Sequence, residues 1–149
     1  MMVLSMVPAT AFAAKDAGTP PTYNSATGCY EISTPAQLLY LAGKWKDGAP
    51  RDGHYVLTAD IDMTGVKGFK PIASKKDEGF TGTFDGQFHS IKGLRVEYEK
   101  KYAGLFGYVN STNAVIKNVG VGGGITANDY AGGIVGFLRA GTVSNCWVG

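Results

Sequence analysis

The sequence predicts a mostly β protein that folds as a parallel β-helix, a solenoid in which each coil of backbone lies on the coil before it. Three observations predict this fold. Short segments match one another about 25 to 27 residues apart, the 149 residues include 22 glycines, and a single segment has helical periodicity. Matches at a period of 20 to 50 residues are typical of repeat architectures, and apolar segments bounded by glycine favour short strands.

The N-terminal segment has the pattern of an export signal. Residues 1–14 are uncharged and end in Ala11-Phe12-Ala13, the small-x-small pattern that signal peptidase cleaves. We interpret 1–14 as an incomplete signal peptide, because the basic start is missing; a disordered apolar tail is the alternative. The apolar run is too short to span a bilayer, so we expect no transmembrane segment and a secreted or cell-surface attached protein. Residues 15–28 are predicted to be a linker.

Residues 29–52 are predicted to form an N-terminal cap around one helix at about 35–47. Thr34 can cap the helix start, Pro35 suits the first helical position, and Gln37 completes a capping box. One face of the helix carries the apolar residues Leu38, Leu41, Ala42 and Trp45. Because a solenoid exposes strand edges at its ends, this helix is expected to cover the first coil.

Residues 53–149 are predicted to form the coils. Apolar and polar residues alternate over 55–63, which indicates a half-buried strand. Residues 80–84 form a second strand, which the turn pair Asp85-Gly86 ends. The chain stops just after a repeat strand, so we expect a solenoid truncated at the C-terminus, with an array that continues beyond 149.

Internal matches fill the rest of the chain. Residues 91–96, 116–121 and 143–148 resemble one another, and 104–108 resembles 133–137. Coils stacked about 4.8 Å apart would place matching residues side by side, so we expect Phe106 beside Val135 and Asn118 beside Asn145.

Glycine and asparagine at repeated positions are predicted to form the bends. Glycine suits a positive φ or a place where a side chain would not fit, and stacked asparagines can bond to each other. A histidine before the strand at 91–96 is expected to make a structural hydrogen bond. The predicted structural residues are Gly104, Gly107, Gly133, Gly136, Asn118, Asn145 and His89.

The order of these motifs resembles the GLUG repeat of bacterial surface proteins. The matching pieces include Gly-Leu-Phe-Gly at 104–107, Ile-Lys-Asn-Val-Gly-Val at 116–121, Gly-Gly-Ile-Val-Gly at 132–136 and Val-Ser-Asn-Cys at 143–146. The resemblance covers about 29–149 and implies a right-handed parallel β-helix in an adhesin-like protein. Such coils also occur in the non-catalytic part of immunoglobulin A peptidases. The sequence has no His-Glu-x-x-His zinc motif, so the resemblance does not extend to peptidase activity.

Acidic residues suggest two candidate sites, and each has a simpler explanation. Asp60 and Asp62 could hold Ca²⁺, but two carboxylates on one strand are too few, which favours a solvated polar face. Asp77-Glu78 near Asp85 could form a glycosidase acid pair, but these residues lie in a loop and a turn. We therefore predict no catalytic residue, no metal and no cofactor.

Charge and cysteine content exclude further classes. With 14 Lys and Arg against 12 Asp and Glu, the net charge is +2, so binding to nucleic acid by phosphate neutralisation is not expected. The two cysteines, Cys29 and Cys146, are too few for a four-cysteine zinc site, and a disulfide between them stays open.

The favoured hypothesis is a non-catalytic extracellular or cell-surface module with an adhesin-like binding role or a spacer role. Tyr98, Tyr102 and Tyr130 are the candidate ligand contacts, because aromatic rings stack on the C–H faces of sugars. The expected partners are a host glycan or an extracellular protein, besides further domains of the same polypeptide. The alternative is a secreted carbohydrate-active enzyme, a polysaccharide lyase or hydrolase on a β-helix.

Overall fold

The computed structural model describes residues 18–43, 48–98 and 100–149. The protein is mostly β, with 50% strand and 9% helix. Its helical elements are α1 (Pro35–Gly43) and the 3-10 helix η2 (Lys76–Glu78). The strands are β1 (Thr22–Asn24), β2 (Cys29–Ile32), β3 (His54–Leu57), β4 (Ile61–Asp62), β5 (Thr83–Asp85), β6 (Ser90–Tyr98), β7 (Tyr102–Ala103), β8 (Phe106–Lys117), β9 (Gly120–Ala127), β10 (Tyr130–Ala131), β11 (Val135–Ser144) and β12 (Trp147–Val148).

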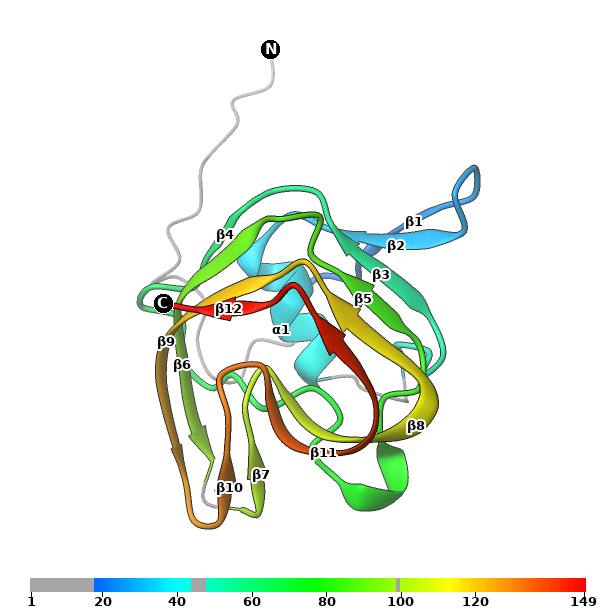
Figure 1. Cartoon of the computed structure of the whole chain (residues 1–149). Helices are drawn as coiled ribbons and strands as arrows, with labels where there is room; N and C mark the ends of the chain where they lie inside the picture. The colour runs from blue at the N-terminus through cyan, green and yellow to red at the C-terminus, as the bar shows by residue number, and fades with distance from the viewer. Residues whose placement is uncertain (1–17, 44–47, 99) are drawn as a thin grey trace.

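The strands of the described residues form three sheets, seen in Figure 1. The largest has the order β1-β2-β3-β5-β8-β11 and is parallel except for the antiparallel pair β1 and β2. A four-stranded sheet, β12-β9-β6-β4, and a two-stranded sheet, β10-β7, are both parallel. Strands β6, β7 and β8 are followed along the chain by β9, β10 and β11, and each lies beside its counterpart.

Segments that match in sequence pair in register. Val135 pairs with Phe106, and the Asn145 side-chain amide donates to Asn118 Oδ1 at 3.3 Å. The prediction that matching residues become neighbours is therefore confirmed. Parallel pairing explains it, because residues in register on adjacent strands point to the same face of the sheet.

The predicted right-handed parallel β-helix with an N-terminal capping helix is wrong. The strands belong to separate sheets, the largest sheet is mixed, and the described residues contain no solenoid that could be detected and no evident helical cap. The outer edge of the six-stranded sheet at its N-terminal side is the β1–β2 hairpin. Sequence repeats reveal which strands lie side by side.

Helix α1 begins where the sequence predicts. Gln37 N–H donates to Thr34 Oγ1 at 3.2 Å, which satisfies one of the free amides at the helix start. The Gln37 side chain reaches back to the Ser33 amide at 2.8 Å, one residue earlier than in a capping box. Leu38 and Leu41 are fully buried in the core, so α1 is part of the protein interior.

Some predicted segments fall partly or wholly outside the described residues. Residues 1–14, predicted as a signal peptide, lie outside them, and so do residues 44–47, which the sequence assigned to the end of the helix. The predicted linker 15–28 contains strand β1.

Packed aromatic rings fill the part of the core that lies against the six-stranded sheet. Tyr55, Phe80, Phe84 and Phe106 are fully buried. The ring of Phe106 lies 4.9 Å from that of Phe80 and 5.3 Å from that of Phe84, between centroids. Burying each such ring contributes roughly 1.5–3 kcal/mol. This interior supports the outer faces of the sheets, which carry the candidate sites.

Candidate functional site

Strand pairing brings together two of the predicted contact residues. Tyr102 in β7 pairs in register with Tyr130 in β10. Their rings stack with centroids 5.6 Å apart and planes 21° apart. Tyr130 is 45% exposed, whereas Tyr102 is half-buried. Pairing thus places one ring on the other and leaves the outer one open to solvent.

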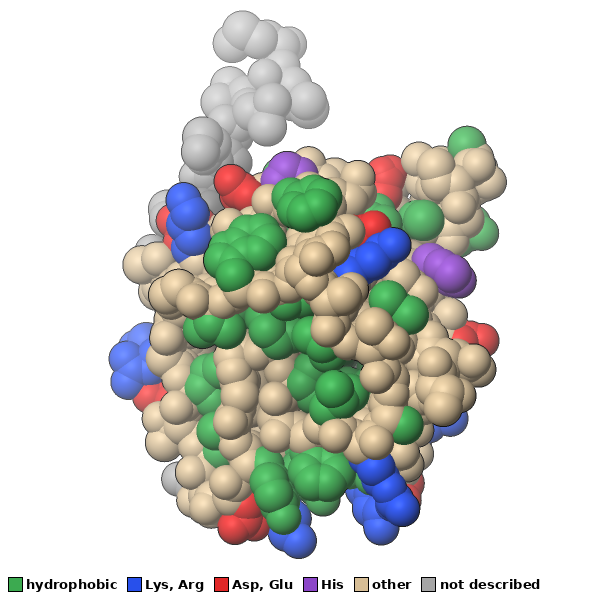
Figure 2. Space-filling model, viewed as in Figure 1, with side chains coloured by type: hydrophobic (Ala, Val, Ile, Leu, Met, Phe, Trp, Pro, Cys, Tyr) green, Lys and Arg blue, Asp and Glu red, His purple; other side chains and the backbone are tan. Residues whose placement is uncertain are grey.

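Two further rings complete this group. Tyr108 in β8 and Phe137 in β11 pair in register, and their rings stack nearly parallel, with centroids 5.4 Å apart and planes 4° apart. Tyr102 contacts both of them, at 5.0 and 5.5 Å between centroids. We call Tyr102, Tyr108, Tyr130 and Phe137 the aromatic cluster. Figure 2 shows hydrophobic side chains at the lower edge of the view, near the ends of β7 and β10.

Sequence reasoning missed Tyr108 and Phe137 as members of the site. The signal was present, because 104–108 matches 133–137 and ends in these two residues. What the sequence did not reveal is that the β7–β10 pair lies against the β8–β11 pair. Tyr108 is 2% exposed, so its ring supports the cluster on the side that faces the protein interior.

Tyr98 does not join the cluster. It ends β6, pairs with Ala127 and is packed partly against the core. It instead lines a separate hollow of about 250 Å³ together with Glu97 and Asn128. The three predicted contact tyrosines therefore divide between two places.

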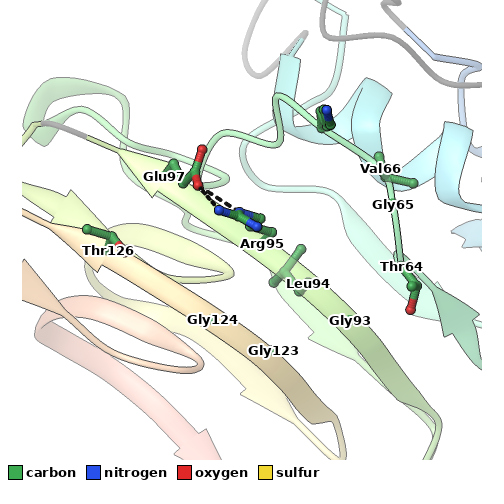
Figure 3. A pocket seen from close by; sticks show the side chains of 11 residues that line it. Thr64, Gly65, Val66, Gly93, Leu94, Arg95, Glu97, Gly123, Gly124 and Thr126 are labelled. Atoms are coloured by element: carbon green, nitrogen blue, oxygen red, sulfur yellow. Dashed lines mark hydrogen bonds and ion pairs between the residues drawn. The ribbon is translucent and has the colours of Figure 1, made fainter. Parts of the chain in front are cut away.

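A larger hollow lies on the outer side of β6 and β9. Its volume is about 460 Å³, and its lining includes the 64–67 segment, Arg95, Glu97 and three glycines, Gly93, Gly123 and Gly124. Figure 3 shows Arg95 and Glu97 turned toward each other, and the Arg95 Nε–H donates to Glu97 Oε1 at 2.7 Å. We call this hollow the outer groove. The sequence analysis did not identify it.

The predicted structural glycines lie where backbones approach closely. A Cβ on Gly136 would lie 2.7 Å from Ala103 N, and one on Gly107 would lie 2.7 Å from Ser74 Cα. A Cβ on Gly104 would meet Gly132 O at 2.6 Å, and one on Gly133 would meet the Val148 side chain at 2.5 Å. At Gly104, Gly107 and Gly136 the close approach of other backbone, not a positive φ, requires glycine, whereas Gly133 meets a side chain.

The acidic residues are occupied by hydrogen bonds. The Ser90 amide donates to Asp60 Oδ1 at 2.8 Å, and His89 Nδ1 lies 3.2 Å from the same oxygen. The backbone hydrogen bond from Ser90, with help from His89, lowers the pKa of Asp60. Hydrogen bonds from the Thr64 side chain and backbone likewise lower the pKa of Asp62. Within the described residues, no group of three His, Cys, Asp or Glu side chains could hold a metal ion.

Asp85 and Asn118 form a polar ladder with Asn145. Asn118 Nδ2 donates to Asp85 Oδ1 at 3.0 Å, and Lys117 Nζ lies 3.6 Å from Asp85 Oδ2. Partial burial raises the pKa of Asp85, but hydrogen bonds from the Gln87 amide and Asn118, with Lys117, outweigh it and lower the pKa.

The suggested glycosidase pair gains no support from this arrangement. Asp77 and Glu78 lie in η2, and the Glu78 carboxylate is 3.8 Å from Lys75 Nζ. The Asp85 carboxylate already accepts the ladder hydrogen bond from Asn118.

The two cysteines are not bridged. Cys29 and Cys146 are both free and half-buried. Cys146 Sγ lies 3.3 Å from Ser144 O, a weak local hydrogen bond. The disulfide that the sequence left open is therefore not formed.

Fold and site together define a mostly β module with an exposed aromatic cluster. The chain is similar to Halomucin from Haloquadratum walsbyi (strain DSM 16790 / HBSQ001), with 36% identity over 126 residues. The similar region covers 78% of this chain and 1% of Halomucin, so the chain corresponds to a very small part of that protein. No protein-family model matches the chain, and the GLUG resemblance stays a prediction. No solved structure matches it either.

Among the described residues, α1 and η2 are both too short to cross a bilayer.

Proposed function

We propose that the chain is a non-catalytic, surface-associated extracellular module with an adhesin-like binding role. The likeness to Halomucin supports the location, because that name refers to mucins, which act outside cells. It also supports a modular role, because the similar region is 1% of Halomucin. A spacer role within a longer polypeptide is the simplest form of the same proposal.

The observation that carries the binding role is the aromatic cluster. Tyr130 offers a ring that is 45% exposed and is held from behind by Tyr102 and Phe137, at 5.6 and 5.1 Å. A ring fixed in this way loses little entropy when a ligand stacks on it, and the Tyr hydroxyl can bond to a polar group at the same time. A sugar ring or a protein side chain with an apolar face meets these requirements.

Glycan and extracellular-matrix-protein arrays test this role directly. We expect the purified chain to bind at least one class of glycan or matrix protein, and Tyr130→Ala to weaken that binding about tenfold, as at a small hot spot. Tyr23→Ala is the matched control, because Tyr23 is 57% exposed but lies in β1, outside the cluster. The absence of binding on both arrays would remove the adhesin-like role and leave the spacer role.

The non-catalytic part of the proposal has its own test. Pectin and host-type glycans are incubated with the chain and Ca²⁺, and unsaturated or reducing products are measured. We expect no turnover. Turnover that Asp85→Asn or Asp77→Asn abolishes would contradict the proposal in favour of a carbohydrate-active enzyme.

A further inference from the structure

The outer groove belongs to a longer furrow along β6. The groove of about 460 Å³ adjoins a hollow of about 290 Å³ at Lys67, Arg95 and Glu97. At its other end, Glu97 and Thr126 also line the hollow of about 250 Å³ that contains Tyr98. Shared lining residues place the three hollows next to one another along β6, so an extended ligand could contact more than one of them.

An irregularity in strand pairing forms the floor of the groove. Ile91 pairs with Val121, but the next pair is Leu94 with Gly123, so β6 has one extra residue there. Gly93 adopts φ 61, and a Cβ on it would lie 2.9 Å from Thr64 N. Bulges of this kind re-aim side chains and are frequent beside functional sites. Here the bulge, together with the lack of a side chain at Gly93, lets the 64–67 segment approach β6.

Gly124 leaves the groove open. It pairs with Arg95, and a Cβ on Gly124 would meet no atom within 4 Å. In contrast, a Cβ on Gly123 would overlap Leu94 O. Backbone contact thus requires glycine at 123, whereas packing within the protein would allow a side chain at 124. Its lack of a side chain creates space for an outside molecule.

The charged residues of the groove carry one excess positive charge, whereas most of its exposed surface is apolar. Arg95, Lys67 and Glu97 contribute the charges. The apolar neighbours Val66 and Leu94 are only 2% and 1% exposed, so their side chains are committed to the core. Arg95 directs Nε and Nη2 toward Glu97, and its Nη1 makes no hydrogen bond in the part of the chain that the structure describes. Lys67 likewise has no ion pair among those residues.

We propose that the outer groove binds an acidic oligosaccharide, with a carboxylate between Arg95 and Lys67. Hydroxyl groups of the sugar can bond to Glu97, Thr126 and the glycine backbone, and the open floor accommodates a flat ring. A peptide suits the groove less well. Its apolar neighbours Val66 and Leu94 are buried, so the groove offers no deep apolar pocket for an anchoring side chain. This site is separate from the aromatic cluster.

Calorimetric titration with hexameric oligogalacturonate tests the charge requirement, with maltohexaose as the neutral probe. We expect oligogalacturonate to bind, maltohexaose to bind far more weakly, and Arg95→Gln to reduce affinity for the acidic probe about tenfold. Arg139→Gln is the matched control. Arg139 is exposed on β11, so this substitution removes the same charge at a place outside the groove. Equal losses in both variants would overturn the proposal in favour of nonspecific charge attraction.

Gly124→Gln tests the shape requirement without strain on the fold. We expect this variant to keep the thermal stability of the parent and to lose oligogalacturonate binding, because the new side chain occupies the groove. Gly43→Gln is the control, because a Cβ on Gly43 also meets nothing within 4 Å but lies at the end of α1. The site is also expected to work in Tyr130→Ala, which separates it from the proposed function.

Three further results would each overturn the proposal. They are no binding of oligogalacturonate by the parent chain, unchanged binding in Gly124→Gln, and tighter binding of poly-glutamate than of oligogalacturonate. The last would identify the groove as a site for acidic peptides.

Discussion

The side-chain amide of Asn145 donates to Asn118 Oδ1 at 3.3 Å, and Asn118 in turn donates to Asp85. Both asparagines adopt a left-handed backbone, with φ of 51° and 55°. Asparagine tolerates this region better than other residues with a side chain. Each asparagine therefore serves two purposes. Its backbone forms a tight bend after a strand, and its side chain makes a hydrogen bond to a residue at the end of the neighbouring strand.

Asn118→Ala should be less stable than Asn118→Gly. Alanine loses the ladder bonds and is strained at φ 55°, so we expect a loss of about 2–3 kcal/mol. Glycine loses the bonds but relieves the strain, so its loss should be smaller by about 1 kcal/mol. Urea denaturation measures both. Equal stability of the two variants would contradict the role assigned to the backbone.

Stability should fall in acid through Asp85. Its pKa is lower in the folded protein than the ordinary value of 3.8, so the ionised carboxylate favours folding. That contribution is present above the ordinary pKa and disappears as the pH falls through the lowered one. Urea denaturation between pH 5 and pH 2 should therefore show a smaller acid loss for Asp85→Asn than for the parent. A steeper loss in the variant would contradict this assignment.

Phe106→Ala should be among the most damaging core changes. Phe106 is fully buried and contacts both Phe80 and Phe84, so we expect a loss of about 3–5 kcal/mol. Phe88→Ala is the matched control, since Phe88 is 69% exposed and should change stability by less than about 0.5 kcal/mol. Thermal unfolding followed by circular dichroism distinguishes them, and similar shifts would argue against the described core.

Gly136→Ala should destabilise the pairing of β11 with its neighbours. The added Cβ would lie 2.7 Å from the Ala103 amide nitrogen, and backbone must shift to admit it, which costs about 1–3 kcal/mol. Gly124→Ala adds the same methyl group to open space and should be nearly neutral. Denaturation midpoints of the two variants test the difference, which a neutral Gly136→Ala would refute.

The sequence was most informative about strand pairing. The matches between 104–108 and 133–137 predicted the register of β8 with β11, and Thr34 with Gln37 predicted the start of α1. These features depend on residues close in the chain or on one pair of adjacent strands. A pattern of residue types can encode them, because each requires only two partners.

The expected capping helix shows where such patterns stop. The spacing of apolar residues in α1 showed that one face of this helix must be buried. Leu38 and Leu41 meet it inside the core, while the β1–β2 hairpin occupies the edge of the six-stranded sheet. An apolar helix face can pack against any apolar surface of the protein, so the pattern alone did not identify the surface that α1 packs against.

By itself the sequence determined a mostly β chain, the residues that pair between neighbouring strands, and Tyr98, Tyr102 and Tyr130 as candidate contacts. Only the tertiary structure decided that Tyr108 and Phe137 join them, that Tyr98 lies apart, and that an open groove runs past Arg95. The physical reason is that pairing links two strands, whereas a cluster or a groove needs three or more segments far apart in the chain. Their relative positions follow from how the whole core packs, which no single repeat contains.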